Sequence, residues 1–373
     1  MSNKEPVSKI GLTLVTTRTL FTTLIRLCTS PFHRNGAPTY FRDVTYAAFR
    51  TQLGLSTLAQ EKLLSVATSD AFEAWTKQGK LVSDTISLPS GVKAHWIGNS
   101  SAKTTLVYLH GGGYVMASTA GHFQYLNDLV QTLNKNGADV AVCLLAYTCA
   151  PEGQYPTQLS EAAELINYLL TEKNRDPSEM MIAGDSAGGN LCAGLLCHLL
   201  HPHPSARVPK LDLGGRKFKA ALLISPWVSF DTRHDSYTRN AQKDIFDSRS
   251  LSRWAPAFLG PAGHVRATEP GQIVGDSYSE PLRAPQGWWS GLPNILEEIM
   301  IWGGEAELFI DGIRQFGENV SDDWVAGGGD RRKVTTIETP NAAHEEMILD
   351  VLLGYKQKGK AAHDFEGWVK ARL

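Results

Sequence analysis

The stretch Met180-Met-Ile-Ala-Gly-Asp-Ser-Ala-Gly188 places Ser186 in the pattern G-x-S-x-G, between a short apolar run and a run of small residues from Ala187 to Leu200. This pattern is typical of a tight turn from a strand into a helix, where side chains at positions 184 and 188 would collide with neighbouring backbone. The turn exposes the serine hydroxyl, and the helix directs its positive end toward negative charge that develops there. The sequence therefore predicts that Ser186 is a nucleophile.

Six short apolar runs, one of which leads into this turn, alternate with helix-like segments. The runs are Thr104–Leu109, Val140–Ala146, Met180–Ala183, Ala220–Ile224, Ile299–Trp302 and Lys333–Ile337. Runs of this length that are rich in Val, Ile and Leu are typical of parallel strands buried on both faces. We therefore predict an α/β fold with a mostly parallel, doubly wound sheet that is covered by helices on both faces.

Two stretches fall outside this alternation. Residues 1–75 are predicted to form a helical N-terminal lid, and residues 76–373 the core, with a lid insertion at about 230–290 that is rich in Trp, Pro, Gly and Ser. Ligands of open α/β sheets bind beyond the carboxyl ends of the strands, where such segments can cover them. Tyr114, Trp254 and Trp288 are predicted to contact substrate, and packing of the lid onto the core is the alternative use of these aromatic rings.

The run His110-Gly-Gly-Gly-Tyr114 directly follows the first of the six apolar runs. Glycines at the end of a strand allow backbone N–H groups to converge on a negatively charged oxygen, because no side chain keeps the substrate away. The N–H groups of Gly111 and Gly112 are predicted to form an oxyanion hole together with that of Ala187. His110 is expected to orient this loop.

A general base is expected late in the chain, because this architecture runs nucleophile, acid and then histidine. His344 directly follows the last apolar run and is the predicted base. His122, which follows the glycine run, is a weaker candidate.

Three carboxylates follow the run Ile299–Trp302, and one of them is needed to orient the imidazole. Glu307 is the preferred acid because it lies far enough beyond the strand and is followed by apolar Leu308 and Phe309. Glu305 and Asp311 remain alternatives, since loop geometry cannot be derived from sequence.

Composition excludes several other classes of protein. The chain has 373 residues with 36 Lys and Arg against 38 Asp and Glu, so it has no basic excess for a nucleic-acid backbone. Its five cysteines form no C-x-x-C pair, which argues against a disulfide framework and a zinc ribbon. We expect no metal and no organic cofactor.

The two ends of the chain bear on its location. Residues 10–28 are apolar but are interrupted by Arg18, Arg26 and several threonines, so we expect an amphipathic helix over the core and no stable membrane insertion. A secretory signal is not expected either. Ala371-Arg372-Leu373 is a conservative variant of the peroxisomal address S-K-L, so the expected location is cytoplasmic or peroxisomal. A homodimer is left open.

Taken with the late His344, the segments His110-Gly-Gly-Gly-Tyr114 and Gly184-Asp-Ser-Ala-Gly-Gly-Asn190 resemble the hormone-sensitive-lipase-like branch of the α/β hydrolases. The resemblance covers roughly residues 90–350. The chain is similar in particular to fungal members, including sterol acetate deacetylases and hydrolases of secondary metabolism. The acid motif of that family, Asp-x-Leu-x-Asp, falls on Glu307-Leu-Phe-Ile-Asp311, where Glu and Phe replace Asp and Leu.

The motifs and the resemblance imply a serine carboxylester hydrolase, an esterase or deacetylase with a Ser-His-Glu catalytic triad. The aromatic-rich lid predicts an apolar ester, and the resemblance implies a short acyl group, such as an acetate on a bulky alcohol. The same triad could serve acyl transfer, amide hydrolysis or a cyclisation. A ligand-binding protein without catalysis is the alternative from another class, and it predicts a damaged triad.

Overall fold

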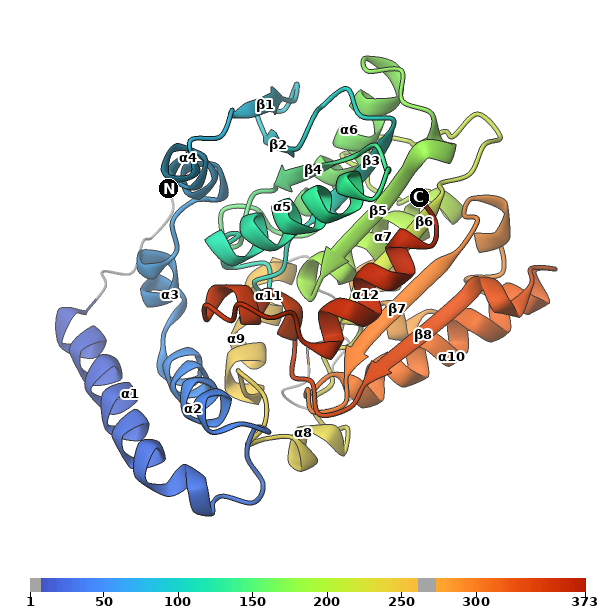
Figure 1. Cartoon of the computed structure of the whole chain (residues 1–373). Helices are drawn as coiled ribbons and strands as arrows, with labels where there is room; N and C mark the ends of the chain where they lie inside the picture. The colour runs from blue at the N-terminus through green and yellow to red at the C-terminus, as the bar shows by residue number, and fades with distance from the viewer. Residues whose placement is uncertain (1–7, 261–272) are drawn as a thin grey trace.

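The computed structural model describes residues 8–260 and 273–373 and has an eight-stranded sheet at its centre (Figure 1). The strand order is β1-β2-β4-β3-β5-β6-β7-β8; β2 runs antiparallel to both of its neighbours, and the other pairs are parallel. The strands are β1 (Asp84–Ser87), β2 (Lys93–Ile97), β3 (Thr104–Leu109), β4 (Val140–Ala146), β5 (Met180–Asp185), β6 (Ala220–Ile224), β7 (Ile299–Gly304) and β8 (Val334–Thr339). The predicted fold class is confirmed.

The six predicted runs coincide with β3 to β8, and β1 and β2 were not predicted. Neither of these two strands contains a long apolar run, and the middle of β2 is the polar residue His95. His95 is fully buried because its two ring nitrogens bond the hydroxyls of Ser69 and Thr85, each at 2.9 Å. Hydrogen bonds from other elements thus compensate for a residue that the apolar pattern does not favour in a strand.

Helices cover both faces of the sheet, as predicted. One face packs on α4 (Thr68–Gly79), α5 (Ala120–Lys135), α11 (Glu346–Leu352) and α12 (Lys360–Lys370), and the other on α6 (Thr157–Thr171), α7 (Ala187–Leu200) and α10 (Ile310–Ala326). In β3, Leu106 and Tyr108 belong to the first layer, whereas Val107 and Leu109 belong to the second. This alternation buries the strand on both sides.

The N-terminal helix α1 (Lys9–Thr29) packs on α2 (Tyr40–Leu55) at a corner of the molecule (Figure 1). The expectation that it lies over the core is wrong, because α2 separates it from the sheet and Val15 is its one buried residue. Large apolar side chains of α1 are exposed instead: Ile10, Leu14, Leu20, Phe21, Leu24, Ile25 and Leu27. Within residues 8–260 and 273–373, no helix has the length and apolar character needed to cross a membrane.

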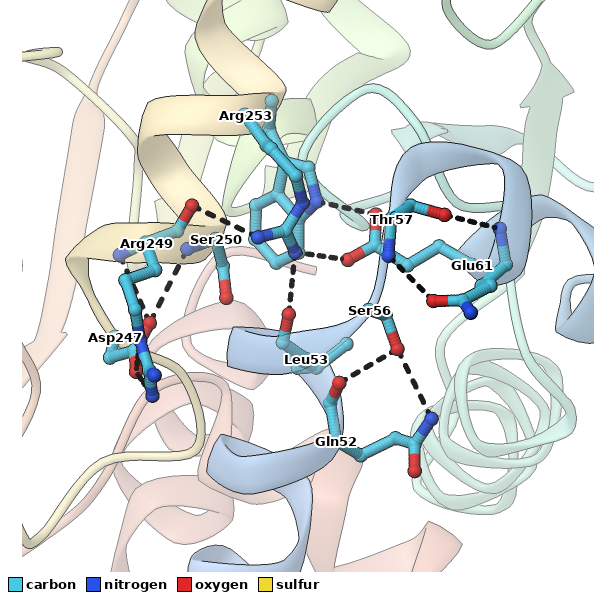
Figure 2. Close-up of polar contacts among 11 residues, drawn as sticks. Gln52, Leu53, Ser56, Thr57, Glu61, Asp247, Arg249, Ser250 and Arg253 are labelled. Carbon is cyan, nitrogen blue, oxygen red and sulfur yellow. Dashed lines mark hydrogen bonds and ion pairs between the residues drawn. The ribbon is translucent and has the colours of Figure 1, made fainter. Parts of the chain in front are cut away.

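The helix α3 (Leu58–Leu64) joins the N-terminal segment to α9 (Ser248–Leu259), as Figure 2 shows. The buried carboxylate of Glu61 accepts hydrogen bonds from Arg253 Nη2 at 2.6 Å and from Trp254 Nε1 at 2.9 Å. Arg253 also donates to the Leu53 carbonyl at the end of α2. Two helices far apart in sequence are therefore connected by one carboxylate. Residues 261–272 of the predicted lid insertion lie outside the described residues.

Replacing Glu61 with Ala is expected to destabilise the protein by on the order of 1–3 kcal/mol, because the buried indole N–H of Trp254 then loses its acceptor. Urea unfolding monitored by tryptophan fluorescence measures the change. Glu73→Ala is the matched control on α4, where the carboxylate is exposed, and its effect should stay within about 0.5 kcal/mol. Equal effects of the two substitutions would contradict a stabilising role for Glu61.

At the C-terminus, Arg372 is folded against the protein. Its Nη2 lies 2.7 Å from the Glu298 carboxylate, and its guanidinium carbon lies 3.6 Å from the centroid of the Trp368 ring. Peroxisomal import through Ala371-Arg372-Leu373 stays a prediction.

Candidate active site

Ser186 lies in the turn between β5 and α7, with φ 50° and ψ −115°. A Cβ on Gly188 would overlap the Leu109 carbonyl, and one on Gly184 would overlap the backbone of Gly188, so both positions require glycine. The Ser186 N–H donates to the Ile224 carbonyl at 2.8 Å, which ties the strained residue to β6. Its side chain is buried and makes no capping hydrogen bond at the start of α7.

The glycine run turns back sharply after β3. Gly112, Gly113 and Tyr114 all have positive φ angles, of 106°, 60° and 63°. A Cβ on Gly113 would lie 2.5 Å from Cε3 of Trp254, so the loop passes directly over that indole. Close packing of this loop thus depends on glycine at position 113.

Among the backbone N–H groups that have no acceptor in the part of the chain that the structure describes, four are of interest near the elbow. Three are the predicted donors of Gly111, Gly112 and Ala187, and the fourth belongs to Gly113. The sequence prediction omitted Gly113, although the third glycine of the run was a signal for it. Unpaired N–H groups in a turn and at a helix N-terminus are suited to stabilise an oxyanion.

His344 and Glu307 form a buried pair beyond the ends of β8 and β7. Nδ1 of His344 lies 2.6 Å from Oε2 of Glu307, and Oε1 of Glu307 accepts the N–H of Gly304 at 2.8 Å. The imidazole is also held by the rings of Phe246 and Phe309, whose planes stand at 83° and 88° to it. A histidine fixed in this way presents Nε2 as its reactive nitrogen.

The other two candidate acids are engaged elsewhere. Glu305 is exposed, and its carboxylate accepts the N–H of Asn341 at 2.9 Å. Asp311 pairs with Arg239 at 2.6 Å and with Arg314 at 2.8 Å. Of the three carboxylates, Glu307 is therefore the one that contacts His344.

Asp244 is a buried residue of the site that the sequence did not suggest. Its Oδ2 accepts the N–H of Leu308 at 2.7 Å, and its Oδ1 lies 3.3 Å from the N–H of His344. Burial raises the pKa of Asp244 to about 6, although the positive charge of a protonated His344 opposes this. One side chain thus holds the acid loop and the histidine loop together, and no local pattern signals a contact between residues this far apart in sequence.

A network of buried polar side chains borders the elbow. Asp185 accepts a hydrogen bond from Tyr108 at 2.7 Å and pairs with His122 at 3.2 Å. His122, Asp185 and Glu345 are the one set within the described residues whose donor atoms, all within 4.8 Å, could meet at a metal ion. Since His122 and Asp185 already bond each other, we interpret the set as a hydrogen-bonded network.

This network leaves His122 and His110 unsuited to act as the base. The ring of His122 is turned toward Asp185. The two nitrogens of His110 bond the Gly111 carbonyl at 2.7 Å and the Thr68 hydroxyl at 3.2 Å, and burial lowers the pKa of His110 to about 4. A neutral His110 therefore braces the glycine loop.

The three predicted substrate contacts lie in different places. Trp254 packs under the glycine loop, whereas the buried ring of Tyr114 stacks on Phe258 and its hydroxyl donates to Asn190 at 2.6 Å. The structure does not bring Trp288 to the elbow: its Nε1 contacts Sγ of Cys197, eleven residues along α7 from Ser186 and so roughly 16 Å away. The composition of residues 230–290 indicated an aromatic-rich insertion, but it did not indicate where each aromatic ring packs.

Comparison with known proteins identifies the family to which the chain belongs. Residues 106–347 match the family model described as the alpha/beta hydrolase fold. An acetyl-hydrolase of Streptomyces hygroscopicus is 30% identical over 212 residues, which cover 56% of this chain and 59% of that protein. The arylacetamide deacetylase of Bos taurus is 27% identical over 230 residues, 59% of this chain and 54% of that protein. The chain thus spans somewhat under three fifths of the length of these relatives.

A solved structure of an esterase from the bacterial hormone-sensitive lipase family superposes with a TM-score of 0.61. It covers 98% of this chain and 99% of its own, at 20% sequence identity. At that level of identity the similarity supports the fold.

Proposed function

This chain belongs to the α/β hydrolase fold family, and on that premise we propose that it is a serine carboxylester hydrolase with Ser186, His344 and Glu307 as its catalytic triad. The observation that carries the proposal is the 2.6 Å bond between Glu307 and Nδ1 of His344, in a site that also holds a strained serine. An intact serine and histidine argue against a protein that only binds ligands.

Each group has a defined step in the proposed reaction. Nε2 of His344 takes the proton of Ser186, and Oγ attacks the ester carbonyl carbon. The resulting oxyanion is stabilised by the N–H groups of the glycine run and Ala187. His344 then gives the proton to the leaving alcohol. A water molecule, deprotonated by the same nitrogen, attacks the acyl group, and the carboxylic acid leaves as Ser186 regains its proton.

The substrate that we propose is a short-chain ester, such as an acetate, of a bulky apolar alcohol. An acetyl-hydrolase and an arylacetamide deacetylase among the relatives support a small acyl group. The apolar side chains of Val66, Val115 and Ala117, which line a cavity just after the glycine run, support an apolar alcohol. A role in fungal sterol or secondary metabolism extends this proposal from the resemblance of the motifs.

We further propose that residues 1–75 and the insertion at 230–290 act as a lid. A cavity of about 400 Å³ is lined by several residues of the segment 62–69 and by Val115 and Ala117, which follow the glycine run. The Glu61 contacts with Arg253 and Trp254 join the two lid segments next to this cavity. A bulky alcohol would reach this region from the elbow.

A series of p-nitrophenyl esters from acetate to decanoate tests the proposed function. We expect kcat/KM to be highest for acetate or butyrate and to fall on the order of tenfold or more toward decanoate, since each methylene that does not fit costs binding energy. The rate of each ester with the Ser186→Ala variant is subtracted as background. A rate that rises steadily with chain length would contradict the short acyl group.

A further inference from the structure

Glu345 directly follows the catalytic histidine and turns its side chain back into the site. Its backbone has a positive φ of 51°, which is uncommon for a residue other than glycine. Its Oε1 lies 3.3 Å from Nε2 of His344, the nitrogen that must accept the proton of Ser186. The side chain therefore contacts a reacting atom, whereas Glu307 contacts the opposite nitrogen.

The same carboxyl also lies close to the other two parts of the proposed catalytic centre. A Cβ on Gly111 would lie 2.6 Å from Oε1 of Glu345 and would overlap Oδ2 of Asp185. Asp185 is the residue before the nucleophile, and Gly111 carries one of the predicted oxyanion donors. Glu345 is thus located where the base, the glycine loop and the elbow meet.

The surroundings of Glu345 supply few donors for a buried carboxylate. Five titratable groups face it from the elements packed around it: His344, Asp185, His122, Tyr108 and Tyr147. His122 and Tyr108 are bonded to Asp185, and the Tyr147 hydroxyl donates to the His110 carbonyl at 2.7 Å. Nε2 of His344 is therefore the donor left for Oε1, which is buried and has no hydrogen bond within the described residues.

Two protonation states follow from this geometry. When Glu345 is ionised, it accepts the Nε2–H of a protonated His344. When that proton moves from Nε2 to Oε1, both groups become neutral, and Glu345 can donate to the nearby carboxylate of Asp185. The second state leaves Nε2 without a proton and so able to accept the one from Ser186.

We propose that Glu345 is a further catalytic residue of the proposed ester hydrolysis, whose carboxyl exchanges a proton with Nε2 of His344 and so controls when this nitrogen is available as a base. The pKa values agree in direction. Burial lowers the pKa of His344, but the charges of Glu345 and Glu307 raise it well above its usual range. Burial and the charge of Asp185 raise the pKa of Glu345.

The first test needs no substrate. The imidazole of His344 is titrated by ¹⁵N NMR in the full-length protein and in Glu345→Gln, which keeps the size of the side chain and removes its charge. An opposite charge at this distance shifts a pKa by about 1–3 units. We expect the pKa of His344 to fall by about one unit or more in the variant. An unchanged titration would overturn the proposal.

The second test is the pH dependence of kcat/KM for p-nitrophenyl acetate. Activity requires neutral His344, so a lower pKa of His344 moves the acidic limb of the profile to lower pH in Glu345→Gln. The matched control is Glu346→Gln. Glu346 is also buried, and burial raises its pKa to about 7, but it pairs with Arg42 at 3.3 Å and its limb should not move.

Glu345→Asp keeps the negative charge but moves it one methylene away from His344. The acidic limb of its kcat/KM profile should lie between those of the wild type and Glu345→Gln. If Glu345→Gln loses activity but the acidic limb of its pH profile does not move, Glu345 has only a structural role and the proposal is overturned. A shifted His344 titration in a protein that hydrolyses no ester would instead contradict the proposed function and leave the proton exchange supported.

Discussion

Ser186→Ala is expected to lower kcat for p-nitrophenyl acetate by about 10⁴-fold or more, because it removes the atom that attacks the carbonyl. Folding should be unaffected, since the hydroxyl caps nothing at the start of α7. Stopped-flow or long-incubation assays with matched circular dichroism spectra measure both effects.

Ser160→Ala is the control for loss of a serine hydroxyl. Ser160 lies on α6, where its hydroxyl donates to the Arg207 carbonyl at 2.6 Å, far in sequence from the elbow. Its kcat should match that of the wild type. If Ser186→Ala retains activity close to that of the wild type, Ser186 is not the nucleophile, and the proposed mechanism fails with it.

Glu307→Gln is expected to reduce kcat on the order of 10³-fold or more. The neutral amide cannot stabilise the imidazolium that forms when His344 takes the proton, and its NH₂ group can bond Nδ1 in the wrong tautomer. The side chain keeps its size, so the buried contacts with Gly304 and His344 persist. The measurement is kcat for the same ester at a fixed pH.

Glu305→Gln is the matched comparison two residues earlier in the same loop. Its carboxylate is exposed and bonds Asn341, so we expect an effect of less than about threefold. The reverse order of the two variants would assign the acid to Glu305. Small and equal effects would mean that the reaction does not depend on a carboxylate at Nδ1.

The strands that form the centre of the sheet could be predicted, because buried parallel strands consist of continuous apolar residues that a linear pattern reveals. The elbow could be predicted for a similar reason: Gly184 and Gly188 lie close in sequence to Ser186, and the steric demand on them is local. The strands β1 and β2 could not be predicted, since the buried His95 in β2 depends on hydrogen bonds with Ser69 and Thr85.

Residues of the site that act over long sequence separations were missed. Asp244 lies 100 residues before His344 and holds it through a backbone hydrogen bond, which no sequence spacing indicates. Glu345 was adjacent to the predicted base, but its inward direction depends on a positive φ angle that the sequence does not reveal. The prediction that Trp288 contacts substrate was wrong, because its ring packs against the far end of α7 although the residue lies in the predicted lid segment.

The contact between Gly113 and Trp254, with Glu61 behind the indole, connects the glycine loop to α3 through the Trp254 ring, in addition to the hydrogen bond between His110 and Thr68 on α4. The position of the glycine loop therefore depends in part on how firmly α3 is attached to α9. Heat or a protease that releases α3 from α9 would loosen the loop while the sheet is still folded. We therefore expect heat inactivation of the proposed hydrolase to begin at the contact between α3 and α9, under conditions milder than those that melt the sheet.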